Sequence, residues 1–91
     1  MNTINKGYVY ILKGNNGKYY VGSTNDLKRR LNQHDNNHTQ TTKKMNGFEL
    51  ALSQEYDSLL VARKIEMKIK NLKRKDCIEK MINDGYIRLT V

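Results

Sequence analysis

The chain has 91 residues, of which 37% are hydrophobic and 29% are charged, so it has room for one domain with a small core. Seventeen Lys and Arg residues against nine Asp and Glu residues give a formal net charge of +8. This charge favours a polyanion as partner, nucleic acid before an anionic membrane surface. No apolar run approaches the roughly 18 residues of a membrane-spanning helix, and segment 1–6 lacks the apolar stretch of a secretory signal. The single cysteine, Cys77, excludes an internal disulfide, so we expect a reducing, cytoplasmic setting.

Two short stretches near the N-terminus have the composition of β-strands. Residues 7–13 and 18–23 are rich in aromatic and β-branched side chains, which suit the pleated surface of a sheet. The segment Gly14-Asn15-Asn16-Gly17 between them has the residues of a tight turn. The sequence therefore predicts a β-hairpin.

The elements after the hairpin follow from caps and apolar spacing. The predicted elements are a helix over 26–34 capped within Thr24-Asn25-Asp26, a polar loop over 35–47 and a strand over 48–56. They continue with a helix capped by Asp57 or Ser58, with Val61, Ala62, Ile65, Ile69 and Leu72 inward, a helix over 75–83 ended by Gly85, and an extended tail from Tyr86. The order β-β-α-β-α-α predicts an α+β fold, a small three-stranded antiparallel sheet flanked by helices. We expect one domain over 1–91 with its core over about 7–83.

Four of the six tyrosines fall inside the hairpin, and the length of its turn decides which of them share a face. A two-residue loop would place Tyr10 and Tyr20 on opposite faces of the sheet. A three-residue loop over 15–17 would place Tyr10 opposite Gly22 and raise both hydroxyls from one face. Asn-Asn-Gly suits the three-residue loop, so the turn permits a paired-tyrosine site. The alternative is that these tyrosines serve only as good strand residues.

Positive charge is concentrated in one helical region. Eight Lys and Arg residues and three acidic residues lie between positions 58 and 80, so this region holds five of the eight net positive charges. A solvated helix face is one interpretation, and electrostatic binding to phosphates is the other. On the shorter helix, Arg30 and His34 stand at i, i+4 and share a face. An exposed arginine and a histidine that interacts with the helix C-terminus are the simpler interpretations of this pair.

Several motifs, in chain order, resemble the GIY-YIG nuclease superfamily. They are Tyr8-Val9-Tyr10, then Tyr20-Val21-Gly22-Ser23-Thr24 after a spacing of nine residues, then Asp26-Leu27 with Arg29-Arg30-Leu31 and His34, then Glu66 in Ala62-Arg63-Lys64-Ile65-Glu66. The segments Thr41-Thr42-Lys43 and Phe48-Glu49-Leu50 look like the small single-domain branch of the superfamily. That branch comprises relatives of the excision-repair endonuclease domain and of structure-specific flap and junction endonucleases. The resemblance covers roughly residues 7–82 and implies a GIY-YIG-like fold.

The resemblance also implies an activity, the hydrolysis of a DNA phosphodiester with one divalent metal, Mg²⁺ or Mn²⁺, in a process such as DNA repair. Glu66 would be the only protein ligand of the metal, which suits the water-rich coordination of Mg²⁺. Tyr10 would be the general base and Tyr20 would position the water or the phosphate, although either tyrosine is a candidate for the base. Arg30 would bind the scissile phosphate, and His34 would hold Tyr10 or the phosphate.

Physical chemistry sets conditions on two of these roles. A free tyrosine has a pKa of about 10, so a tyrosine base needs cationic neighbours, which Arg30 and the metal would supply. The simpler interpretation of Glu66 is an i,i+4 ion pair with Lys70.

The sequence departs from the family pattern at a few positions. The first triplet is Tyr-Val-Tyr rather than Gly-Ile-Tyr and the second has Val for Ile, and both changes keep the tyrosines. Some members have a lysine where Ser23 stands here, and Lys43 is a candidate to supply that charge. Others use an asparagine late in the chain, for which Asn71 and Asn83 are both candidates.

The sequence therefore predicts a metal-dependent DNA endonuclease that prefers flaps, junctions or single strands, or that nicks DNA weakly without specificity. We expect Lys43, Lys70, Lys73 and Arg74 to contact the nucleic acid, and a protein partner is a candidate source of specificity. One alternative is an inactive nucleic-acid-binding module of the same fold. Another is a protein-interaction domain with a basic surface. Cys77 is expected to be buried or half-buried on the last helix and without chemistry.

Overall fold

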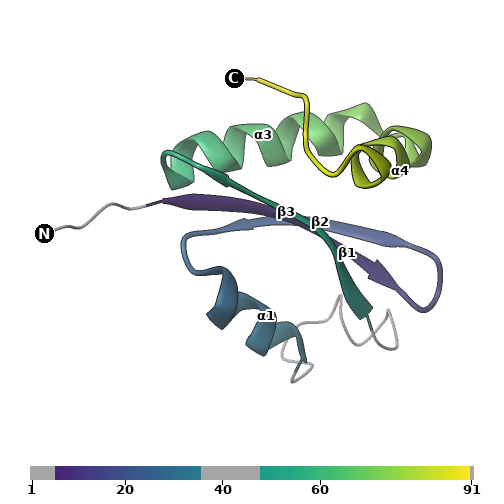
Figure 1. The fold of residues 1–91 in the computed structure, drawn as a ribbon, viewed down its shortest axis with the longest axis horizontal. Coiled ribbons are helices and arrows are strands. Elements are labelled where there is room, and N and C mark those ends of the chain that lie inside the picture. Colours follow the sequence, from purple (N-terminus) through teal and green to yellow (C-terminus); the bar gives the residue numbers. More distant parts are fainter. Residues whose placement is uncertain (1–5, 36–47, 91) are drawn as a thin grey trace, which may run out of the picture.

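The computed structural model describes residues 6–35 and 48–90. Its elements in chain order are β1 (Gly7–Gly14), β2 (Tyr19–Thr24), α1 (Leu27–Asp35), β3 (Phe48–Tyr56), α3 (Leu59–Leu72) and α4 (Lys75–Asp84) (Figure 1). The predicted order of strands and helices is confirmed, and their ends lie within one residue of the predicted bounds. The polar loop predicted beyond α1 lies outside the described residues, apart from Asp35, which ends the helix.

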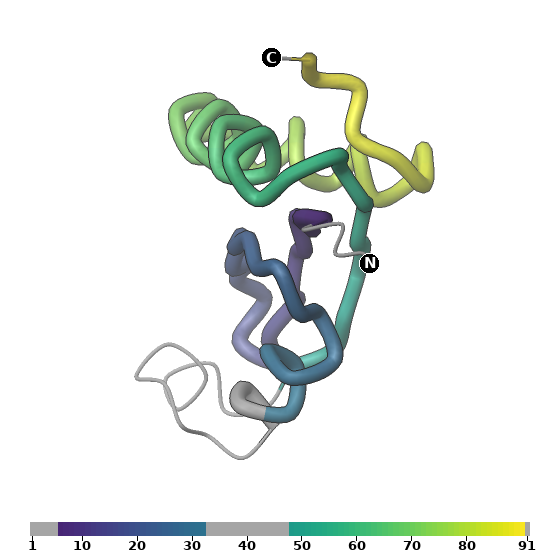
Figure 2. The backbone as a smooth tube through the Cα atoms, turned by 90° about the vertical axis from the view of Figure 1, so that its left-hand side faces the viewer, coloured from purple at the N-terminus to yellow at the C-terminus, as the bar shows by residue number. Residues whose placement is uncertain are grey.

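The three strands form one antiparallel sheet in the order β2-β1-β3, so β1 is central. Helices α3 and α4 cover one face of the sheet and α1 covers the other (Figure 1). Figure 2 shows the same three layers from the side. Because β2 pairs only with β1 among the described strands, its outer edge is open to side chains that arrive from either face.

The turn between β1 and β2 fixes how the two strands pair. Gly17 has a φ of 80°, the left-handed conformation that glycine adopts without strain. The backbone N–H of Gly14 donates to the carbonyl of Lys18 at 2.9 Å, which closes a three-residue loop. Tyr10 consequently pairs with Gly22 and Leu12 pairs with Tyr20, as the three-residue turn predicts.

The central strand is buried on both sides, and its alternation divides the core into two clusters. On the α3 side lie buried apolar residues of all three strands, of α3 and α4, and of the segment after α4: Val9, Ile11, Val21, Leu52, Ala62, Ile65, Ile69, Met81 and Ile87. On the α1 side, the buried Tyr10 and Leu12 pack against Tyr20, Leu27, Leu31 and Phe48. Of the stripe predicted for α3, Ala62, Ile65 and Ile69 are buried in this cluster and Leu72 packs against it, whereas Val61 is only half-buried.

Side chains and backbone conformation define the ends of the two C-terminal helices. Ser58, one of the two predicted caps, caps α3 by accepting a hydrogen bond from the backbone N–H of Val61 at 3.2 Å. Helix α3 ends at Leu72 and is capped by Lys73, which adopts the left-handed conformation with a φ of 51°. Helix α4 ends as predicted at Gly85, with a φ of 80°. Cys77, on α4, is half-buried as expected.

The segment after α4 has no regular secondary structure but is attached to β3. The side chain of Gln54 accepts from the backbone N–H of Ile87 at 2.7 Å and donates to its carbonyl at 3.2 Å. Ile87 is itself buried in the cluster under α3. This part of the chain is therefore packed against the fold rather than free.

None of the helices in the described ranges is long and apolar enough to cross a bilayer.

Candidate active site

The side chain of Tyr10 crosses the sheet toward its open edge because its neighbour on β2 is a glycine. A Cβ placed on Gly22 would lie 2.4 Å from the Tyr10 hydroxyl and 2.5 Å from Cζ, so any larger residue would displace the ring. The ring of Tyr20, on the same face, lies with its centroid 6.3 Å from that of Tyr10 at an interplanar angle of 49°. The hairpin thus brings the two tyrosines together, as its turn permits.

Helix α1 brings Arg30 to the Tyr10 hydroxyl. The Arg30 Nε–H donates to Tyr10 Oη at 3.1 Å. The position of Arg30 is set by the start of the helix, where the carboxylate of Asp26 accepts from the backbone N–H of Arg29 at 3.1 Å. Thr24 in turn accepts from the N–H of Asp26 at 3.1 Å, which ties the start of α1 to the end of β2. The cap predicted within Thr24-Asn25-Asp26 therefore places the arginine that meets Tyr10.

Burial reinforces the neutral form of Tyr10 in this structure. Desolvation raises the pKa of Tyr10 and outweighs the hydrogen bond from Arg30, which lowers it, while Tyr20 and Glu66 raise it further. Arg30 lowers the pKa of Tyr10, as expected, but the net pKa is still above its ordinary value because burial raises it by more. Tyr10 is a neutral phenol at pH 7, and the same hydrogen bond raises the pKa of Arg30.

Glu66 reaches the same edge of the sheet from the opposite face. It lies in the middle of α3, and one of its carboxylate oxygens accepts a hydrogen bond from the hydroxyl of Ser23. Ser23 follows Gly22 on β2, so strand alternation directs its side chain to the α3 face. The other oxygen of Glu66 pairs with the ammonium group of Lys70, one helical turn along α3. The i,i+4 pair expected as the simpler role of Glu66 is therefore present.

The edge of β2 thus carries two half-sites. One face supplies Tyr10, Tyr20 and Arg30, and the other supplies Glu66 with Ser23 and Lys70. The charge of Glu66 acts at the Tyr10 hydroxyl, because it contributes to the raised pKa of that group. The arrangement combines a carboxylate, a guanidinium and two phenols around one strand, which are groups that bind a cation, bind a phosphate and exchange protons.

The donor set at Glu66 fits Mg²⁺ or Mn²⁺ held mainly by water. The Glu66 side chain is 18% exposed, and no group of three His, Cys, Asp or Glu side chains gathers as a metal cluster within the described ranges. A single carboxylate is sufficient for Mg²⁺, which keeps several of its waters. The hydroxyl of Ser23 can stay in place, whereas a cation at Glu66 would displace the ammonium group of Lys70.

The other residues singled out from the sequence lie at different distances from this site. His34 belongs to α1, but its side chain and all of Lys43 lie outside the described residues. Lys70, Lys73 and Arg74 line a pocket beside the two half-sites, together with Tyr20. Asn71 and Asn83, the two candidate asparagines, are exposed and line neither this pocket nor the one beside Ser23.

Sequence reasoning missed two features of the site. Ser23 was noted only for the lysine it replaces, whereas the structure places its hydroxyl on Glu66. Strand alternation after Gly22 is the signal that could have found it. A polar pocket of about 280 Å³ also lies beside Ser23, and three arginines line it: Arg29, Arg30 and Arg63. The position of Arg63, one turn before Glu66 on α3, is the signal for its place beside the site.

Comparison with known proteins identifies the class to which this fold and site belong. The model of the GIY-YIG catalytic domain matches residues 6–81. The chain therefore belongs to the GIY-YIG family, a family of nucleases that generally use a divalent metal.

Individual relatives agree with this assignment. The chain is 30% identical to a UPF0213 protein of Staphylococcus saprophyticus and 34% identical to one of Staphylococcus epidermidis, in each case over 83 residues that cover 90% of this chain and 100% of the relative. It is also similar to the solution NMR structure of a UPF0213 protein from Bacillus halodurans. That similarity has a TM-score of 0.57 and 28% identity, and it covers 88% of this chain and 86% of the other.

Proposed function

We propose that the protein is a divalent-metal-dependent endonuclease that hydrolyses DNA phosphodiesters at the edge of β2. The observation that carries the proposal is that Tyr10 and Arg30 lie over Gly22 on one face of β2, while Glu66 lies at the neighbouring Ser23 on the other face. Arginine binds phosphate in a planar, charge-assisted geometry, and its position beside a phenol couples phosphate binding to proton exchange.

Each side chain has a role that follows from its contacts. Arg30 binds the scissile phosphate while it holds the hydroxyl of Tyr10 by its Nε. Tyr10, as its phenolate, takes a proton from the attacking water as the new phosphorus–oxygen bond forms, and the leaving sugar oxygen takes a proton from solvent as its bond to phosphorus breaks. Tyr20 orients that water or the phosphate beside Tyr10. Glu66, oriented by Ser23, would hold the divalent cation.

The cation supplies what the described side chains lack. When bound at Glu66, it would offset the negative charge of the phosphate and lower the pKa of water and phenol nearby. The buried Tyr10 needs such a charge, because Arg30 alone leaves its pKa above the ordinary value. Lys70 would leave Glu66 and become available for a neighbouring phosphate.

A cleavage assay tests the proposal. Labelled single-stranded, duplex, flap and four-way-junction DNA would be incubated with the wild type, with Glu66→Gln and with Tyr10→Phe, in Mg²⁺, in Mn²⁺ and in chelator. We expect metal-dependent cleavage by the wild type and losses of about 100-fold or more in both variants, the usual range for a lost charge-stabilising or proton-transfer group.

Glu49→Gln is the matched control, because Glu49 is an exposed carboxylate on β3, which β1 separates from β2. It should cleave as the wild type does. If the wild type binds DNA in a salt-dependent way but cleaves none of the four substrates, the protein is an inactive nucleic-acid-binding module instead.

A further inference from the structure

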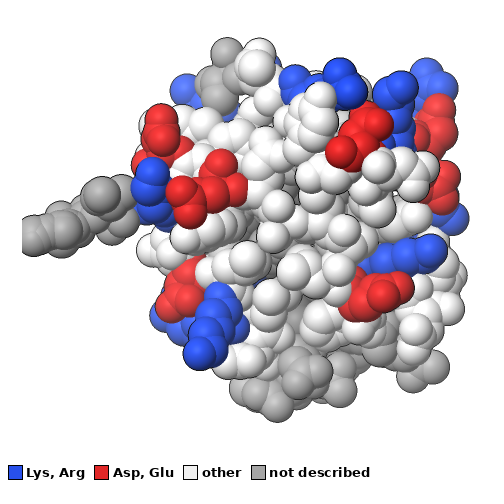
Figure 3. Space-filling model, viewed as in Figure 1, with Lys and Arg blue, Asp and Glu red and all other residues white. Residues whose placement is uncertain are grey.

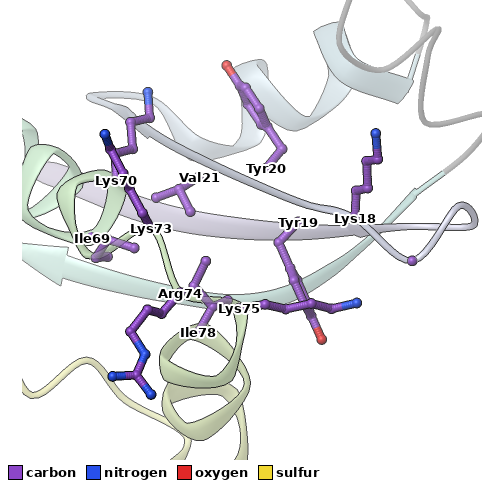
Figure 4. A pocket seen from close by; sticks show the side chains of 11 residues that line it. Lys18, Tyr19, Tyr20, Val21, Ile69, Lys70, Lys73, Arg74, Lys75 and Ile78 are labelled. Atoms are coloured by element: carbon purple, nitrogen blue, oxygen red, sulfur yellow. The ribbon is translucent and has the colours of Figure 1, made fainter.

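A groove of about 460 Å³ runs along the outer edge of β2, where the end of α3 meets the start of α4 (Figure 4). Its apolar part is formed by Val21 on the strand and by Ile69 and Ile78 on the two helices. Five basic residues surround this part: Lys18, Lys70, Lys73, Arg74 and Lys75. The groove therefore combines an apolar floor with a positive rim.

One wall of the groove is an aromatic ring held in place from two sides. The Tyr19 hydroxyl donates to the carboxylate of Glu79 at 3.2 Å, and the ammonium group of Lys75 lies 5.7 Å from the centre of the ring. Figure 4 shows Tyr19 and Lys75 extending side by side, while Lys18 and Tyr20 extend to the opposite side of the strand. A ring with a fixed orientation is suited to contact with another flat group.

The backbone at the rim is in a conformation that favours glycine, yet the residue there is a lysine. Lys73 has a φ of 51°, and it is the one non-glycine residue with positive φ in the described ranges. Glycine is the usual residue at this position after a helix. Lys73 has no ion-pair partner among the described residues, so its ammonium group is available at the rim of the groove. Backbone strain of this kind is concentrated at functional positions.

The charge around the groove, at the β2 edge of the sheet, differs from the charge at the opposite, β3 edge. On the face nearest the viewer in Figure 1, acidic and basic side chains are interspersed around an uncharged centre (Figure 3). At the groove, Lys70 and Arg74 have acidic partners in Glu66 and Asp76, whereas Lys18 and Lys73 have none among the described residues. An anionic ligand is therefore favoured at the groove.

The groove is continuous with the candidate active site. Tyr20 lines the groove and also packs against Tyr10, and Lys70 lines it and also pairs with Glu66. A strand that occupies the groove would therefore lead, past Tyr20, toward the phosphate position beside Tyr10 and Arg30.

We propose that the groove holds an unpaired nucleotide of the DNA strand, with its base on the apolar floor against Tyr19 and its phosphates on Lys18 and Lys73. A paired base cannot reach the floor, because its faces are stacked inside the duplex. The groove would therefore make the enzyme select single-stranded or splayed DNA near the cleavage position. This inference rests on the proposed function for the position of the scissile phosphate.

A binding experiment without turnover tests the inference. The full-length Glu66→Gln variant in chelator would be titrated into three fluorescent probes of equal phosphate number: a single-stranded oligonucleotide, the same oligonucleotide with abasic sites throughout, and a duplex. We expect the single strand to bind at least 5-fold more tightly than either other probe, since stacking of one base contributes about 5- to 150-fold. Equal affinity for the abasic probe or for the duplex would overturn the proposal.

Two variants locate the binding in the groove. Lys73→Gly removes the ammonium group and relieves the strained backbone, so it should weaken single-strand binding several-fold without lowering the melting temperature. The control is Lys80→Gln, which removes an exposed charge of α4 that lies outside the groove. Glutamine is used rather than glycine because a glycine within α4 would weaken the helix. Equal effects of the Lys73 and Lys80 changes would contradict a groove-specific contact.

The two proposals fail in different ways. If DNA is cleaved but the abasic and normal strands bind equally, the groove proposal is wrong and the nuclease stands. If single strands bind through their bases but none of the substrates is cleaved, the nuclease proposal is wrong and the groove is a binding site for unpaired nucleotides.

Discussion

At the scale of single residues, Gly22 determines whether Tyr10 can reach its partners. Because Gly22 has no side chain, the phenol of Tyr10 can occupy the space beside it. A Cβ at this position would lie only 2.4 Å from the hydroxyl. The neighbouring Ser23 uses the other face to hold Glu66. Two consecutive residues of one strand therefore connect the halves of the site, one by lacking a side chain and one by donating a hydrogen bond.

Replacing Gly22 with alanine should displace the Tyr10 ring and separate its hydroxyl from Arg30. Overpacking of this kind costs about 1–3 kcal/mol of the free energy of unfolding, which urea denaturation measures. We also expect cleavage to fall by at least 10-fold. The check is a double-mutant cycle with Tyr10→Phe. If Gly22→Ala lowers cleavage as strongly in the Tyr10→Phe background as in the wild type, the glycine acts by some other route.

The raised pKa of Tyr10 predicts how stability responds to alkali. Because burial favours the neutral phenol in the folded state, its contribution to stability is fully present below the unfolded pKa of about 10 and is lost as pH rises through the higher folded value. Tyr10→Phe should therefore flatten the fall in the free energy of unfolding between about pH 9 and 11.

Urea titrations at several pH values measure this slope. Tyr19 and Tyr56 also have raised pKa values, with desolvation as the largest cause, so the slope should decrease without disappearing. Tyr8→Phe serves as the comparison. If the two variants gave the same slope of unfolding free energy against pH, Tyr10 would ionise as easily in the folded state as in the unfolded state.

At the scale of elements, local sequence predicts the half of the site that lies on the hairpin, and long-range packing determines the half at Glu66. The residues of the turn predict the pairing of Tyr10 with Gly22, because loop length and the left-handed glycine set the register within one hairpin. The contact between Ser23 and Glu66 joins residues 43 positions apart and depends on how α3 lies on the sheet. Turn chemistry carries no information about that docking; the family resemblance named Glu66, but its contact with Ser23 required the structure.

The groove was also beyond the reach of sequence patterns. The spacing of Lys70, Lys73 and Arg74 indicates a basic helical region, and the apolar stripe predicts which face α3 buries. The groove itself arises where Lys73 caps α3 and α4 begins beside Tyr19. That junction depends on a left-handed lysine, a conformation that the residue type argues against.

The segment after α4 offers a test of how one side chain attaches an element. Gln54→Ala removes both hydrogen bonds to the backbone of Ile87. We expect a loss of about 1–3 kcal/mol in the free energy of unfolding and faster proteolysis within residues 86–90, because the bonds to a partly buried backbone are left unmade. Ser53→Ala, an exposed neighbour on β3, is the control. Unchanged proteolysis would mean that burial of Ile87 alone holds the segment.

At the scale of the whole molecule, the excess of positive charge acts on folding and on DNA binding in opposite directions. A net charge of +8 on 91 residues repels itself in the compact state, and it attracts the phosphates of a strand in the groove. Screening by salt weakens both interactions. The charge is therefore a cost in the free protein and a source of affinity in the complex.

Raising NaCl from about 50 to 500 mM should therefore increase the melting temperature of the free protein and weaken its binding to single-stranded DNA. For binding, the slope of log affinity against log salt is expected to fall by about 0.7 when one phosphate contact is lost, as in Lys73→Gly, and to stay the same in Lys80→Gln. Thermal melts of the free protein and anisotropy titrations on Glu66→Gln, with and without the lysine changes, measure the two responses over one salt series. If binding were insensitive to salt while the melting temperature rose, the basic surface would be a feature of folding and solubility alone, and the apolar floor would have to hold the base without help from phosphates.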